Sequence, residues 1–194
     1  MTAGTHRIFI AVPLDPSLRE AVRALETRIE ADGARVRWVK PENLHFTLRF
    51  LGHVGEGELA RVREAARRAC AGTGPFRITR GGVGAFPNAR RPQVVWIGGG
   101  EGAAAMVALA TRLEDALAAA GFSSEDREFA PHLTLARVKE PRLWGDLSRV
   151  LPSYQGERVG EQAVACIVVM ESLLRPQGAV YTPVEEVRLA THEK

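Results

Sequence analysis

The sequence contains one four-residue pattern twice, HFTL in its first half and HLTL in its second. Both copies lie in runs where apolar and polar residues alternate, which is typical of a half-buried β-strand. Side chains two residues apart on a strand share a face, so His45 lies beside Thr47, and His132 lies beside Thr134. The apolar residues between them occupy the opposite face. The repeat therefore predicts a site made of two equivalent halves, each with one imidazole and one hydroxyl.

The spacing of apolar residues elsewhere predicts an α+β fold, with about three main helices on antiparallel or mixed sheet. Helices are predicted over 16–33, 59–72 and 106–121, with a short one over 142–150. Strands are predicted at 7–12, 36–39, 44–51, 76–80, 93–97, 129–138, 163–171 and 179–189. The glycine-rich segments 81–84 and 98–103 are predicted to be turns. In each half a helix and a glycine-containing turn precede the histidine-bearing strand, which favours an old duplication.

The composition is that of an ordinary globular protein, with 45% apolar and 25% charged residues. The 194 residues allow a single domain over 1–194 with two lobes. No apolar run reaches the roughly 20 residues that span a bilayer, and no secretory signal pattern is present, so we expect a cytoplasmic protein. Cys70 and Cys166 lack metal-binding spacing and should be buried apolar residues. A net charge of +3 fits a small anionic ligand or a nucleic-acid end.

Two histidines that face one site suit general acid–base catalysis near neutral pH. Imidazole has a pKa of about 6.5, so one ring can accept a proton while the other donates one. The threonine hydroxyls are short hydrogen-bond donors that suit the non-bridging oxygens of a phosphate. Strands hold such groups more rigidly than a loop does. The pattern favours displacement at phosphorus without a metal.

Other interpretations of these residues stay open. A zinc site would add His53 to His45 and His132, although no HExxH or cysteine pattern supplies further ligands. The segment GGGEGA at 98–103 is superficially like a dinucleotide-binding loop, but no acidic strand end follows it. Aromatic residues that could include a surface for stacking bases, although most are expected in the core, are Phe9, Trp38, Phe86, Phe129 and Tyr181.

Longer segments carry a resemblance to a known family. They are RIFIAV at 7–12, PENLHFTLRFLG at 41–52, GGVGAFPNARRPQVVW at 81–96 and FAPHLTLARV at 129–138. With these segments the chain resembles the bacterial and archaeal RNA 2′,3′-cyclic phosphodiesterases, also named 2′–5′ RNA ligases, of the two-histidine phosphoesterase superfamily. The resemblance implies a two-lobed, pseudo-twofold α+β fold of antiparallel sheets flanked by helices, with both HxT motifs in a central groove.

The same resemblance implies hydrolysis of an RNA-terminal 2′,3′-cyclic phosphate to a 2′-phosphomonoester. It implies that His45 donates a proton to the leaving O3′ and that His132 accepts one from the attacking water. Thr47 and Thr134 would bond the phosphate oxygens, and no cofactor or metal is implied. The substrates would be RNA ends or small cyclic-phosphate nucleotides, and we expect a monomer. Ligation of RNA ends through a 2′–5′ bond, and binding of RNA ends without turnover, stay as alternatives.

Two arginines are candidates for substrate contact, because a guanidinium offers paired donors to phosphate. Arg49 shares strand parity with His45 and should face the same side. Arg137 matches the arginine that contacts phosphate in the family's HLTLxR block. Strict alternation, however, puts Arg137 on the face of Leu133, so its role requires a bulge or a strand end there.

Overall fold

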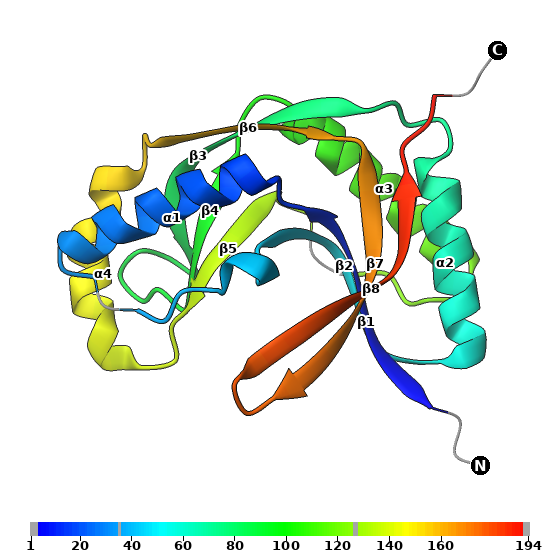
Figure 1. Ribbon diagram of the computed structural model, residues 1–194, viewed down its shortest axis with the longest axis horizontal. Coiled ribbons are helices and arrows are strands. Elements are labelled where there is room, and N and C mark those ends of the chain that lie inside the picture. The colour runs from blue at the N-terminus through cyan, green and yellow to red at the C-terminus, as the bar shows by residue number, and fades with distance from the viewer. Residues whose placement is uncertain (1–3, 35, 126–127, 192–194) are drawn as a thin grey trace.

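The computed structural model describes residues 4–34, 36–125 and 128–191 (Figure 1). Over these ranges the chain forms two four-stranded antiparallel sheets, ordered β2–β1–β7–β8 and β5–β4–β3–β6. The strands are β1 (Thr5–Pro13), β2 (His45–Gly55), β3 (Phe76–Phe86), β4 (Val94–Gly99), β5 (His132–Arg137), β6 (Arg158–Val164), β7 (Cys166–Arg175) and β8 (Gly178–Arg188). The helices are α1 (Pro16–Ala31), α2 (Glu56–Cys70), α3 (Ala103–Ala119) and α4 (Trp144–Val150). The predicted α+β class is confirmed.

The two lobes exchange a helix. The unit β1–α1–β2 corresponds to the unit β4–α3–β5, because each joins two paired antiparallel strands through a helix. Helix α1 packs against β6 of the other sheet, whereas α3 packs mainly against α2 and contacts both β2 of the other sheet and β3 of its own. Figure 1 accordingly has α1 and α4 at the left and α2 and α3 at the right. The exchange ties the two sheets into one two-lobed body.

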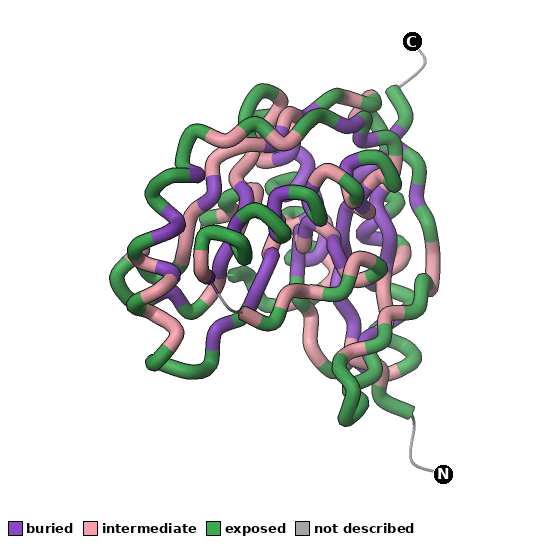
Figure 2. Tube along the Cα trace, turned by 60° about the vertical axis from the view of Figure 1, so that its left-hand side comes forward, coloured by how far each residue is buried: buried purple, intermediate pink, exposed green. Residues whose placement is uncertain are grey.

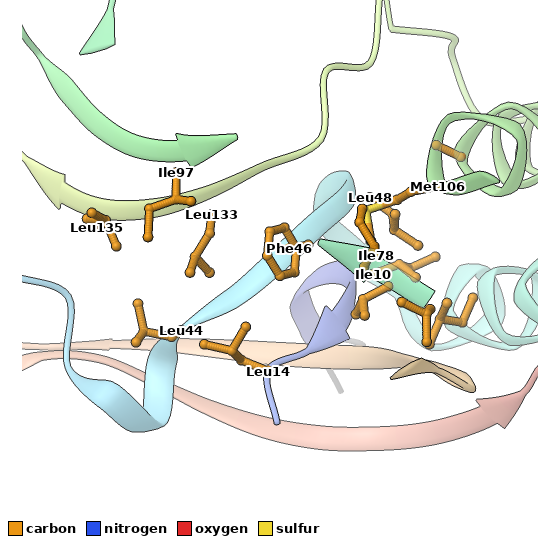
Figure 3. Packing of buried hydrophobic residues seen from close by; sticks show 14 of the residues in the cluster. Ile10, Leu14, Leu44, Phe46, Leu48, Ile78, Ile97, Met106, Leu133 and Leu135 are labelled. Carbon is orange, nitrogen blue, oxygen red and sulfur yellow. The ribbon is translucent and has the colours of Figure 1, made fainter. Parts of the chain in front are cut away.

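Apolar side chains from both sheets form one core cluster. Phe46 of β2 lies beside Leu133 of β5 there, and Leu48 lies toward Ile78 and Met106, as the close-up in Figure 3 shows. Buried residues are concentrated in the strands. The solvent-facing sides of the helices and the tip of the β7–β8 hairpin are exposed (Figure 2). Each such side chain contributes about 1.5–3 kcal/mol by leaving water. The apolar positions between the histidines and threonines therefore anchor both motifs.

Arg80 of β3 is a charged residue inside this core, only 2% exposed. Its guanidinium carbon lies 3.6 Å from the centroid of the Phe46 ring. Burial lowers the pKa of Arg80 to about 9. Phe46 stands between His45 and Thr47 in the sequence. The stacking of the Arg80 guanidinium on the Phe46 ring therefore supports the first motif from the core side.

Several predicted boundaries differ from the structure. Residues 81–84, predicted as a turn, continue β3, and residues 158–162 of β6 were not predicted as strand. The glycines allow close approach without ending the strand: a Cβ at Gly84 would lie 2.3 Å from the Trp96 ring. The predicted strand 163–171 divides between β6 and β7, and 36–39 contributes only a bridge from Trp38 to Ala136.

The remaining expectations have mixed outcomes. The three main helices are confirmed, and the turn predicted over 98–103 is confined to 100–102, because 98–99 continue β4 and 103 begins α3. Cys70 is buried as predicted, but Cys166 is only half-buried, and both thiols are free. In the described ranges no helix is long and apolar enough to cross a membrane.

Candidate active site

Each motif histidine begins its strand and is held by the backbone just before it. Nδ1 of His45 lies 2.7 Å from the carbonyl oxygen of Asn43, and Nδ1 of His132 lies 2.8 Å from that of Ala130. A carbonyl only accepts, so Nδ1 carries the proton in both rings and Nε2 is left for chemistry. Both bonds reach two residues back. The two halves of the molecule therefore orient their imidazoles in the same way.

The motif threonines share the faces of their histidines. The Thr47 hydroxyl lies 3.0 Å from Nε2 of His45 and donates to it when that nitrogen is unprotonated. On β5, His132 and Thr134 pair with Gly98 and Trp96 of β4, which are two residues apart and so share one face. Both predicted His-x-Thr pairings on one strand face are present.

Strands β2 and β5 bring the two motifs to one side of the molecule. They are the edge strands of their sheets and contact each other without forming a ladder. Phe46 and Leu133 face the common core, so the histidines and threonines of both strands face away from it. We call this surface, formed by His45, Thr47, His132 and Thr134, the HxT face. It collects two imidazoles and two hydroxyls, as the repeat predicts.

The environment of His45 lowers its pKa below the usual value. Burial is the main cause, the positive charge of Arg137 adds to it, and the hydrogen bond to Asn43 opposes both. The lowered pKa favours the neutral ring of His45 in the free protein. The effect also means that Arg137, from the opposite strand, lies close enough to act on His45.

A β-bulge places Arg137 on the HxT face. Thr134 pairs with Trp96 and Arg137 pairs with Val94, with the register shifted between them. Trp96 and Val94 share a face, so Leu135 is the extra residue and Arg137 returns to the side of Thr134. The bulge needed to place Arg137 on the same face as His132 and Thr134 is therefore present. Arg137 is exposed there.

An equivalent bulge moves Arg49 off the HxT face, and the prediction from strand parity is wrong. Thr47 pairs with Ala11 and Arg49 with Ile10, leaving Leu48 as the extra residue. Arg49 is only 7% exposed. Its guanidinium pairs with Glu114 at 3.2 Å and with Glu125 at 2.7 Å, and it donates to the carbonyl of Ser123. Arg49 thus ties β2 to α3 and the segment after it.

The bulge on β2 brings Phe50 to the HxT face in place of Arg49. Phe50 pairs with Phe9, which in turn contacts the ring of His45. Sequence reasoning missed Phe50, because strict alternation assigns it to the core. The only available signal was the second copy of the motif, in which the residue five positions after the histidine is Arg137.

The described residues hold no group of three or more histidine, cysteine, aspartate or glutamate side chains arranged to bind a metal ion. His53, the third histidine of the zinc interpretation, is exposed near the far end of β2. It is therefore separated from His45 along the strand.

A family model described as LigT like Phosphoesterase matches residues 12–96 and 99–181. The chain belongs to this family. The match covers both motifs and the strands that carry them.

Relatives in the LigT-like family match over nearly the whole chain. A protein of Methanothermobacter thermautotrophicus named RNA 2′,3′-cyclic phosphodiesterase is 40% identical over 183 residues, which is 94% of this chain and 98% of the relative. One of the same name from Archaeoglobus fulgidus is 39% identical over 175 residues, covering 90% of this chain and 96% of the relative.

Solved structures agree with the LigT-like fold. TT0787 of Thermus thermophilus has a TM-score of 0.78 and 31% identity, covering 96% of this chain and 100% of the neighbour. The complex of E. coli LigT with 3′-AMP has a TM-score of 0.76 and 26% identity, covering 96% and 99% of the two chains. The two-sheet, helix-flanked architecture is therefore that of the family.

Proposed function

We propose that this chain hydrolyses the 2′,3′-cyclic phosphate at the end of an RNA to a 2′-phosphomonoester, without a metal. The observation that carries the proposal is the duplicated geometry of His45 and His132, each held through Nδ1 so that Nε2 faces the substrate side. The names of the two relatives support the same activity. The 3′-AMP bound to E. coli LigT supports a nucleotide carrying phosphate on its ribose as the ligand class.

The reaction is an in-line displacement at phosphorus. Nε2 of His132 takes a proton from water, whose oxygen forms a new bond to phosphorus. The bond from phosphorus to O3′ breaks, and Nε2–H of His45 donates its proton to O3′. One water is consumed and the 2′-phosphomonoester carries its oxygen. The step needs one neutral and one protonated imidazole on opposite sides of phosphorus.

Substrate binding supplies the proton state that His45 needs. The pKa of His45 is lowered in the free protein by burial and by Arg137. An anionic phosphate bound by Arg137 offsets both effects and raises the pKa of His45. Once Nε2 is protonated it no longer accepts from Thr47, so that hydroxyl is free to donate to a non-bridging oxygen, as Thr134 does from the other side.

The experiment uses a short RNA ending in a 2′,3′-cyclic phosphate, incubated with the protein in EDTA. We expect a 2′-monoester that a phosphatase removes. His45→Ala and His132→Ala should each lower the rate by about 10²–10⁴-fold, because each removes an acid or base from the displacement itself.

His53→Ala is the matched control, since it removes an exposed histidine near the far end of β2, eight residues along the strand from His45. It should keep the wild-type rate. Near-wild-type activity of either motif variant would contradict the paired-histidine mechanism, and loss of activity in EDTA would contradict metal independence. RNA bound without turnover would instead favour an RNA-end binding module.

A further inference from the structure

Arg80 is a buried cation whose hydrogen-bonding groups are poorly satisfied. Its side chain is 2% exposed, and among the described residues neither Nε nor Nη2 has a hydrogen-bond partner. Nη1 makes only a long bond of 3.4 Å to the carbonyl oxygen of Thr79. Burial lowers the pKa of Arg80, and no acidic group among the described residues opposes that effect. An unpaired buried charge destabilises a fold, so stability does not explain this arginine.

The guanidinium of Arg80 joins one sheet to the other. Its carbon lies 3.6 Å from the centroid of the Phe46 ring. Arg80 belongs to β3 and Phe46 to β2, which are strands of different sheets. Strands β2 and β5 contact each other without forming a ladder, so backbone hydrogen bonds between them do not fix the distance between the two motifs. Side-chain packing at this junction of the sheets fixes it instead.

Phe46 lies directly behind both motifs. On β2 it separates His45 from Thr47, and Leu133, the corresponding residue of the second motif, lies beside it in the core (Figure 3). Any movement of Phe46 into the space that the guanidinium occupies would carry β2 with it and shift β2 relative to β5. The separation of the two imidazoles therefore depends on what holds the Phe46 ring.

We propose that Arg80 is a positioning residue, which sets the separation of His45 and His132 by holding Phe46 across the junction of the sheets. This rests on the proposed function, in which the two imidazoles act on opposite sides of one phosphorus. Reacting atoms must be about 3–3.5 Å apart, and misplacement by about 1 Å costs about 10²-fold in rate. Arg80 acts through Phe46 from the core, without contact to the substrate.

The chemistry of arginine suits this role better than that of an aliphatic residue. A guanidinium is flat and covers the face of an aromatic ring. Methionine fills a similar space without charge, but its flexible chain holds a neighbour less firmly. Replacement of a buried charge by an apolar side chain of similar volume is often neutral or stabilising. Activity and stability should therefore respond to Arg80→Met in different directions.

The test measures hydrolysis of adenosine 2′,3′-cyclic phosphate and urea unfolding of Arg80→Met. We expect kcat to fall about 10- to 100-fold, whereas KM should change by less than about threefold, because Arg137 still binds the phosphate. The urea midpoint should stay at the wild-type value or rise. The alkaline limb of kcat/KM should stay in place, because Arg80 is not among the groups that shift the pKa of His45.

A double-mutant cycle tests the route through Phe46. Phe46→Leu removes the ring, so the double variant of Arg80→Met with Phe46→Leu should lose no more kcat than the larger of the two single losses. Arg49→Met is the matched control, since Arg49 is also a buried arginine but forms ion pairs with Glu114 and Glu125. It should show the reverse pattern, a lower urea midpoint with kcat within a few-fold of wild type.

A wild-type kcat in Arg80→Met would overturn the proposal. A urea midpoint lowered as far as in Arg49→Met would instead assign Arg80 a purely structural role, and a shifted alkaline limb would assign it an electrostatic one. Independent losses of kcat in the cycle would overturn the route through Phe46. A wild-type protein that does not hydrolyse the cyclic phosphate would overturn the proposed function itself.

Discussion

At the scale of single residues, two histidines from one repeated motif differ in their surroundings. Both are fixed through Nδ1 by a backbone carbonyl, which sets the same tautomer in each. His45 has a threonine hydroxyl 3.0 Å from its Nε2, and its pKa is lowered by burial and by Arg137. His132 contacts the Ala130 carbonyl and the edge of the Phe86 ring. Identical motifs therefore present chemically different groups, which is what separate acid and base roles require.

The pH dependence of kcat/KM follows from the lowered pKa of His45. His45 must be protonated in the free enzyme to act as the proton donor, and this protonated form is lost progressively as pH rises through its pKa. The alkaline limb of kcat/KM should therefore lie below about pH 6.5. The alkaline limb of kcat should lie at higher pH, because bound phosphate raises the pKa. Arg137→Ala should move the kcat/KM limb upward, and Arg137→Lys, which keeps the charge, should not. A kcat/KM that rises through this range as His45 deprotonates would contradict the donor role.

At the scale of elements, two β-bulges decide which of the two arginines lies on the HxT face. Each inserts one leucine after the motif threonine and reverses the facing of the residues that follow directly, Arg49 and Phe50 on β2 and Arg137 on β5. Alternation read from the sequence therefore assigns Arg49 and Arg137 to the wrong faces together. The family resemblance suggested the correct face for Arg137, but nothing in the local sequence of β2 distinguishes Arg49 from a groove residue.

The two arginines should respond to mutation in opposite ways. Arg137→Ala should lower kcat/KM about 10- to 100-fold with little change in stability, since it removes charge-assisted hydrogen bonds from an exposed side chain. Arg49→Met should leave kcat/KM within a few-fold but lower the free energy of unfolding by about 1–3 kcal/mol, a moderate loss because Glu114 and Glu125 are partly solvated. Kinetics and urea unfolding measure both. Arg188→Ala, at an 88% exposed side chain on β8, is the control. A large kinetic loss in Arg49→Met would restore that residue to the substrate site.

At the scale of the whole molecule, the exchanged helices α1 and α3 hold the two sheets together. Helix α1 follows the first strand of one sheet and packs on the other, so its buried face belongs to the joint between lobes. Glu26 lies on that face, 6% exposed, with one carboxylate oxygen lacking a hydrogen-bond partner. Burial raises its pKa to about 7.

Glu26 should make the protein less stable as pH rises. Its folded-state pKa lies above the unfolded value near 4.5, so the folded state binds the proton more tightly and stability falls as pH rises from about 4.5 through 7. Glu26→Gln removes this cost and should raise the free energy of unfolding at pH 8 by roughly 1–3 kcal/mol, with no gain below pH 4.5. Urea unfolding across pH measures it, with the exposed Glu20→Gln as control. A gain that is equal at pH 4 and pH 8 would contradict the titration.

The sequence by itself determined the class of the fold and the composition of the HxT face. Alternation and helical spacing are local properties, so the strands around His45 and His132, the three main helices and the burial of Phe46 and Leu133 could be predicted without knowing any long-range contact. The duplicated motif likewise predicted paired imidazoles and hydroxyls. Local signals failed where glycines replaced the expected alternation in β3, because backbone pairing and not side-chain pattern extends that strand.

Only the tertiary structure decided the facing of residues beyond each motif and the partners of each helix. A bulge depends on the register between two strands, and register is set by how both sheets close over one core, which no single segment encodes. The same closure placed Arg137 near His45, buried Arg49 and Glu26, and exposed Phe50. Residues at similar positions after the two motifs therefore differ: Arg137 is an exposed cation, Arg49 belongs to a buried ion pair, and Phe50 is an exposed aromatic side chain.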